Sequence, residues 1–134
     1  MPQENVEILR KAIEAFNEGD IEGPIANLIA PEFEYIPTGS VPGMERVYRG
    51  PEGWRQFLEF FWSEFDQPRI EIRGLVASDE HVVAAQTFRG RGKQSGVEAS
   101  WDLWNVWTLR DGKAVRGQAF TTESEALEAA GLSE

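Results

Sequence analysis

The spacing of the hydrophobic residues changes near Pro68, and this change constrains the fold more than any other feature of the sequence. Before Pro68, apolar residues recur every three or four positions, as in amphipathic helices. After Pro68, β-branched and aromatic residues alternate with polar ones, as in strands with two different faces. Helices that precede a run of strands indicate an α+β fold, and 134 residues suffice for a single domain, residues 1–134.

Two helices are predicted before residue 31. The first presents one apolar face and ends near Gly19; the face consists of Val6, Leu9, Ile13 and Phe16. The second is expected over residues 21–30, because Pro31 would stop it. A short strand is expected next, over residues 32–37.

A loop and a third helix are predicted between this strand and Pro68. Residues 38–50 contain Gly and Pro without periodicity, which predicts a loop of the kind that covers a binding site as a lid. Pro51 is a favourable first residue for the helix. Its apolar stripe is wide and mostly aromatic: Trp54, Phe57, Leu58, Phe61, Trp62 and Phe65.

Four consecutive antiparallel strands are predicted after Pro68. Their expected ranges are 69–77, 81–92, 96–110 and 113–121. The last two are joined by Asp111-Gly112, a strong signal for a two-residue hairpin turn. Beyond them, Thr122 and Glu125 have the spacing of a capping box, which predicts a short C-terminal helix closed by Gly131.

The hairpin turn allows the last two strands to be aligned. A two-residue loop predicts the facing pairs Arg110 with Lys113, Leu109 with Ala114, Trp107 with Arg116, Asn105 with Gln118, and Leu103 with Phe120. Alternation then places Trp101, Asn105 and Trp107 on one face and Asp102 and Trp104 on the other. Because both faces carry tryptophan, we expect one face to pack on the helices and the other on a second subunit, in a homodimer.

Charge and composition exclude several classes of partner. The net charge of −10 repels phosphate backbones and anionic lipids, so neither nucleic acid nor a membrane is an expected partner. The N-terminal segment has neither a basic leader nor an apolar signal core, which predicts a cytoplasmic protein. With no cysteine, one histidine and no calcium-loop spacing, the sequence predicts no metal site and no cofactor.

Two stretches, "FNEGDIEGPIANLIAPEFEY" and "VWTLRDGKAVRG", together with the order of the elements, carry a family resemblance. The sequence resembles the nuclear transport factor 2-like superfamily and, within it, the SnoaL-like group. The resemblance implies a cone-shaped fold, in which a curved, mixed sheet wraps around a long helix and encloses an apolar pocket, usually in a homodimer. It implies no particular reaction, because the superfamily includes isomerases, cyclases, hydrolases and proteins that are not enzymes.

The catalytic positions of the enzymatic relatives carry different residues here. Ketosteroid isomerases have a catalytic aspartate before a Pro-x-Gly-Ser stretch, and the matching stretch "IPTGS" places Ile36 there. Their oxyanion-binding tyrosine matches Ala12, and their oxyanion-binding aspartic acid matches Asn105, as does the acid/base aspartate of SnoaL-like cyclases. Asn105 can donate or accept a hydrogen bond but cannot exchange a proton at neutral pH.

Three hypotheses follow for the function. In the first, the protein binds a small, largely apolar molecule whose polar end is oriented by Asn105, Gln118 and Tyr35. The expected ligand-contacting residues are Tyr35, Trp54, Phe57, Phe61, Phe88, Trp101, Leu103, Asn105, Trp107, Gln118 and Phe120. In the second, it is an isomerase, polyketide cyclase or epoxide hydrolase with Asp102 or Glu34 as general base. In the third, the rings form only core and dimer contacts, and Asn105 with Gln118 is a structural amide pair.

Overall fold

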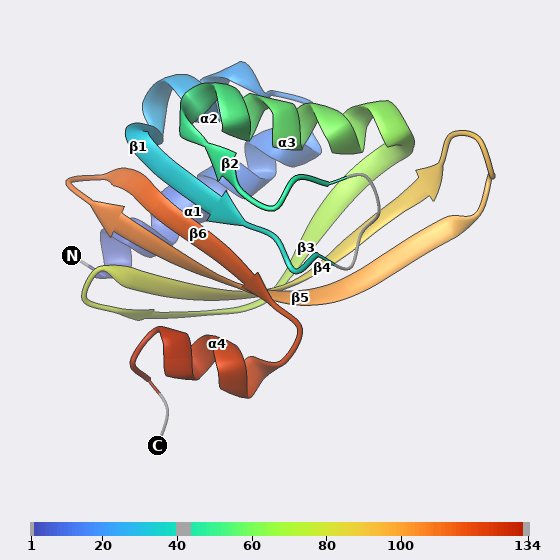
Figure 1. Cartoon of the computed structure of the whole chain (residues 1–134). Helices are drawn as coiled ribbons and strands as arrows, with labels where there is room; N and C mark the ends of the chain where they lie inside the picture. The colour runs from blue at the N-terminus through green and yellow to red at the C-terminus, as the bar shows by residue number, and fades with distance from the viewer. Residues whose placement is uncertain (1, 40–43, 133–134) are drawn as a thin grey trace.

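The computed structural model describes residues 2–39 and 44–132. These residues form helices α1 (Pro2–Asn17), α2 (Glu22–Asn27), α3 (Gly50–Glu64) and α4 (Glu123–Ala129). The strands are β1 (Ile29–Ile36), β2 (Tyr48–Arg49), β3 (Phe65–Ser78), β4 (His81–Gly92), β5 (Glu98–Arg110) and β6 (Lys113–Phe120). Figure 1 shows α1, α2 and α3 on one side of a single sheet and α4 on the other.

The sheet is mixed and six-stranded, with the order β2-β1-β6-β5-β4-β3. Within the described residues, β1 and β6 pair in parallel, and the other neighbouring strands are antiparallel. The curved sheet and the helices on its inner side have the arrangement of the cone-shaped fold, so the predicted α+β class is confirmed.

Both prolines that were expected to end helices lie inside strands. The second helix ends at Asn27, and β1 already begins at Ile29, so Pro31 belongs to the strand. The third helix ends at Glu64, and Pro68 lies in β3. In each case the ladder shifts its register around the proline, between Ile29 and Glu34 in β1 and between Asp66 and Arg69 in β3. Such irregularities accommodate a residue that has no backbone N–H to donate.

The predicted register of the last hairpin is right at the turn and wrong beyond it. Asp111 and Gly112 both have positive φ, and Leu109 faces Ala114 as expected. The next pair is Thr108 with Arg116, so Val115 is an extra residue, a β-bulge. The pairs that follow are Trp107 with Gly117, Val106 with Gln118, Asn105 with Ala119, and Trp104 with Phe120. The bulge therefore moves Gln118 and Phe120 to the outer face of the sheet.

The C-terminal helix covers part of the outer face. Thr122 caps α4, as the sequence predicts, and Ala126 and Ala130 pack against Val83 and Val106. Around them lie Trp104, Phe120, Leu127 and Leu132, which are partly buried. The chain's own helix thus accounts for outward apolar residues that were expected to need a second subunit. No helix within the described ranges is long and apolar enough to cross a membrane.

Candidate functional site

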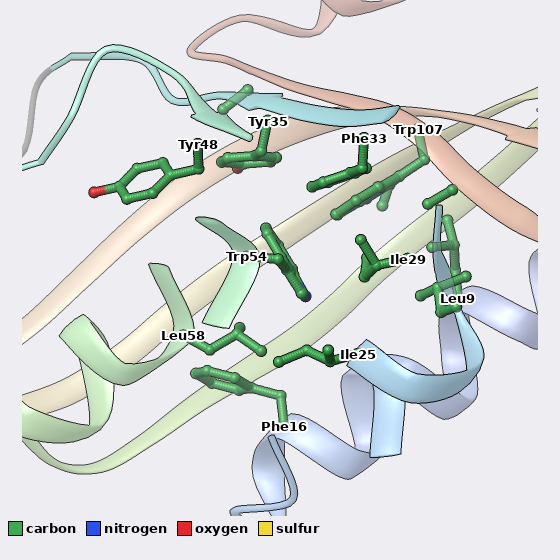
Figure 2. Packing of buried hydrophobic residues seen from close by; sticks show 14 of the residues in the cluster. Leu9, Phe16, Ile25, Ile29, Phe33, Tyr35, Tyr48, Trp54, Leu58 and Trp107 are labelled. Carbon is green, nitrogen blue, oxygen red and sulfur yellow. The ribbon is translucent and has the colours of Figure 1, made fainter. Parts of the chain in front are cut away.

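A cavity of about 80 Å³ lies between the inner face of the sheet and the helices. Its walls are mostly apolar, and eight of the expected ligand-contacting residues line it: Tyr35, Trp54, Phe57, Phe61, Phe88, Leu103, Asn105 and Trp107. Figure 2 shows Trp54 between the sheet rings of Tyr35 and Trp107 and the helix side chains of Leu58 and Ile25. The aromatic stripe of α3 therefore forms the wall opposite the sheet.

Small residues around Asn105 make room for the rings beside it. Ala84 of β4 and Ala119 of β6 are its neighbours across the two ladders. Gly117 is more restrictive, because a Cβ there would lie 2.8 Å from Cδ1 of Tyr35 and 2.9 Å from Cζ3 of Trp107. The absence of a side chain at residue 117 lets these two rings pack against the sheet beside Asn105.

Asn105 and Tyr35 form a buried hydrogen bond. The hydroxyl of Tyr35 donates to Oδ1 of Asn105 over 2.7 Å, and both residues are almost fully buried. Burial raises the pKa of Tyr35 well above its ordinary value of 10, and the hydrogen bond offsets part of this rise. Tyr35 is therefore a neutral hydroxyl throughout the physiological pH range.

Several other polar groups at the cavity have no partner among the residues that the structure describes. Gln86 is 6% exposed and lines the cavity, and its side-chain amide forms no hydrogen bond with any residue in the described ranges. The same holds for Nδ2 of Asn105 and for the indole nitrogen of Trp54. The indole nitrogens of Trp107, which lines the cavity, and of Trp62, which does not, are completely buried without a partner among those residues. The unpaired atoms of Gln86, Asn105 and Trp54 are not completely buried, so they are accessible to a molecule in the cavity.

The two candidate general bases lie outside the cavity. Asp102 is on the outer face of β5, where it accepts a hydrogen bond of 2.7 Å from Thr87 and lies 3.9 Å from Arg73. Glu34 forms ion pairs with Arg49 and Arg116 at the exterior. The cavity lining contains no Asp, Glu, His or Lys from the described ranges. Nor do those ranges contain a cluster of three or more His, Cys, Asp or Glu residues that could hold a metal ion.

A second, smaller cavity of about 40 Å³ adjoins the first. Trp101 lines it, together with Pro37, Thr38 and Met44. The two cavities share five walls: Tyr35, Phe57, Phe61, Phe88 and Leu103. Of the segment expected to form a lid, Thr38 and Met44 lie at this cavity, residues 48–50 belong to β2 and α3, and residues 40–43 are outside the described residues.

Gln118 and Phe120 take no part in either cavity. Gln118 accepts a hydrogen bond from Arg116 at the exterior, and Phe120 packs beside α4. The expected Asn105–Gln118 pair is therefore wrong, and the hydroxyl of Tyr35 takes the place of the Gln118 amide. The amide that the sequence reasoning missed is Gln86, which lies opposite Leu103. Its signal was the alternation of Val82, Ala84, Gln86 and Phe88 along one face of β4.

Comparison with known proteins identifies the family. A family model of the SnoaL-like domain matches residues 9–117, well over half of the chain. The chain belongs to the SnoaL-like family. A search of curated proteins gives no match for this SnoaL-like protein.

Solved structures share the fold of this SnoaL-like protein. A nuclear transport factor 2-like protein from Burkholderia xenovorans LB400 is 26% identical, with 97% of each chain covered and a TM-score of 0.74. One of unknown function from Burkholderia pseudomallei K96243 is 23% identical, with a TM-score of 0.77 over 93% of this chain and 95% of that one. TerC, co-crystallised with polyporic acid, is 24% identical, with a TM-score of 0.76 over 96% and 98%.

Proposed function

We propose that this SnoaL-like protein binds a small, neutral, largely apolar molecule whose carbonyl or hydroxyl group forms hydrogen bonds with Asn105 and Gln86. The observation that carries the proposal is that the side-chain amide of Gln86 and Nδ2 of Asn105 have no partner among the described residues and lie at an aromatic cavity. Each hydrogen bond from these donors to a ligand acceptor would contribute about 0.5–1.5 kcal/mol to binding. A few precisely placed polar groups in an apolar lining are typical of small-molecule sites.

The lining favours a ligand that accepts hydrogen bonds and has no charge. The amides of Asn105 and Gln86 and the indole of Trp54 all offer N–H donors, whereas the hydroxyl of Tyr35 is already donated to Asn105. A charged group would lose its hydration at this site without gaining an opposite charge, which is costly. The carbonyl of a ketone, quinone or lactone meets these requirements.

The enzymatic alternative has less support. A reaction of isomerase, cyclase or epoxide-hydrolase type with Asp102 or Glu34 as base needs that carboxylate inside the cavity, and both are engaged with arginines at the exterior. TerC, a solved structure with the same fold, was co-crystallised with polyporic acid, which supports the binding of a small molecule more than it supports a particular reaction.

Thermal unfolding with acetophenone and benzoate, a neutral ketone and an anion of similar size, tests the proposal. Acetophenone at about 100 times its dissociation constant would stabilise the protein by roughly 2.7 kcal/mol, and benzoate should have little effect. Gln86→Leu should weaken the acetophenone effect, whereas Gln118→Leu, the matched change on the outer face, should not. Equal stabilisation by both compounds, or an effect insensitive to Gln86→Leu, would contradict the proposal.

We also propose that two copies associate through the outer sheet face and that the protein is cytoplasmic. The support for association is Val76, which lies opposite Val83 on the outer face and is 51% exposed. Light scattering coupled to size exclusion tests this, with Val76→Glu expected to shift the mass towards that of the monomer. A monomeric mass for the unmodified protein would refute the association.

A further inference from the structure

The two cavities are too small to hold a ring separately. An engineered protein cavity that binds benzene has a volume of about 150 Å³. Neither the inner cavity, about 80 Å³, nor the outer one, about 40 Å³, reaches this size. If the protein binds a ring-containing molecule such as acetophenone, part of the cavity wall must move.

The five residues that line both cavities separate them, and two of these residues can move. Of the five residues, Tyr35 is held by its hydrogen bond to Asn105, and Phe61 and Phe88 are only 8% and 4% exposed. The remaining two, Phe57 and Leu103, are partly exposed. A side chain that already borders solvent can change rotamer with less repacking than one enclosed on all sides.

Of these two residues, Phe57 is the one that packs among aromatic rings. Its ring stacks on Trp54 with centroids 4.9 Å apart, and it contacts Tyr35 at 4.7 Å, Phe61 at 5.0 Å and Tyr48 at 5.2 Å. All four partners are aromatic, and no hydrogen bond fixes the ring. Since an incoming aromatic or apolar group could replace these contacts, displacement of Phe57 by a ligand would lose little packing.

The two cavities differ in the position of their amide groups, which gives a ligand a direction. The amides of Asn105 and Gln86 line the inner cavity. Among the described residues, no Asn or Gln lines the outer cavity, whose walls include Thr38, Trp101 and Met44, the last a flexible and polarisable side chain that adapts to different shapes. A ligand that spans both would therefore place its hydrogen-bonding end in the inner cavity and an apolar lobe beside Trp101.

We propose that the two cavities are halves of one elongated binding site, that Phe57 is the gate between them, and that the ligand is a neutral molecule with a carbonyl end and a second apolar ring. This proposal rests on the proposed function and specifies its ligand class and its specificity-determining residue. An elongated ligand can bind only to molecules in which Phe57 is displaced. Its apparent affinity is therefore the intrinsic affinity multiplied by the fraction of such molecules.

The test compares acetophenone with 4-acetylbiphenyl, which adds a second ring to the same ketone, by calorimetric titration. The unmodified protein should bind 4-acetylbiphenyl more tightly than acetophenone. Phe57→Ala should increase the preference for the longer ketone by about tenfold, and Phe57→Leu should do so less strongly. Phe60→Ala is the matched control, because Phe60 lies on the same helix but lines neither cavity. Trp101→Phe should weaken binding of the longer ketone only.

The outcomes separate this inference from the proposed function. If acetophenone binds in a Gln86-dependent manner and both Phe57 variants leave the preference unchanged, the gate is refuted and the proposed function stands. Exclusion of 4-acetylbiphenyl from the unmodified protein and from both variants would also refute the gate. If neither ketone binds to any of the three proteins, both proposals fail. Phe57→Leu keeps the test valid if Phe57→Ala does not fold.

Discussion

The buried hydrogen bond between Tyr35 and Asn105 provides the sharpest test of how the inner face is stabilised. The hydroxyl and the amide oxygen are 2.7 Å apart, and Tyr35 and Asn105 are each only 3% exposed. Tyr35→Phe leaves Oδ1 of Asn105 without its donor, and Asn105→Leu leaves the hydroxyl of Tyr35 without its acceptor. The double variant removes both polar groups from the same place.

The expected free energies of unfolding are distinctly non-additive. Each single change should cost about 1–3 kcal/mol, because one buried polar group is left unpaired. Replacing both partners by apolar groups is nearly neutral, so the double variant should be more stable than the sum of the single changes by about 1–3 kcal/mol. For a chain of this length, each kcal/mol corresponds to roughly 4 °C in Tm.

Urea unfolding of the four proteins, with the m-value checked for constancy, measures this coupling. Tyr48→Phe combined with Asn105→Leu is the control, because the hydroxyl of Tyr48 accepts a hydrogen bond from the backbone of Glu45 and has no bond to Asn105. The control pair should be additive to within about 0.5 kcal/mol. Additivity in the Tyr35–Asn105 cycle would refute the reasoning, because it would mean that neither group depends on the other.

Three further changes test the surroundings of this bond. Gly117→Ala should destabilise the protein by about 1–3 kcal/mol in urea unfolding, because the added methyl overpacks the ring of Tyr35, whereas Gly74→Ala, which meets open space, should not. Burial should raise the pKa of the new acid in Asn105→Asp, so the unfolded chain ionises first. The variant should therefore lose stability as the pH rises above about 4. A loss of stability that does not depend on pH would contradict this prediction. Burial raises the pKa of Tyr35, so above about pH 10 only the unfolded state readily releases its proton. The free energy of unfolding should therefore fall less steeply with pH in Tyr35→Phe than in the unmodified protein. Alkaline unfolding curves that coincide would refute this prediction.

Apart from the two-residue strand β2, which lies in the segment predicted as a loop, the order of the elements could be predicted from the sequence because periodicity is a local property. The apolar spacing that defines α1 and the aromatic stripe of α3 depend only on neighbouring residues. The β-bulges were not predictable in the same way. Val115 has no feature that marks it as an extra residue, yet it determines that Ala119, and not Gln118, lies opposite Asn105.

The hydrogen-bonding groups of the site were predicted only in part, because their contacts are not a local property of the sequence. Tyr35 and Asn105 were both expected near the cavity, but their bond depends on a parallel pairing of β1 and β6 that is distant in sequence. Gln86 was not predicted, although alternation places it on the same face of β4 as Ala84 and Phe88, because its relation to Asn105 depends on which face the helices cover. The outward position of Asp102 did follow from alternation, and no bulge in β5 reverses it.

Asparagine at position 105 should make ligand binding insensitive to pH. The amides of Asn105 and Gln86 do not titrate, and burial keeps Tyr35 protonated beyond the range in which enzymes usually operate. The affinity for acetophenone should therefore be constant between about pH 5 and pH 9, whereas a site built around a catalytic carboxylate shows pH-dependent behaviour. Asn105→Asp should introduce that dependence, with affinity changing as the buried acid ionises. If the unmodified protein already shows a titration in this range, a carboxylate or imidazole contributes to binding, and the uncharged site proposed here is wrong.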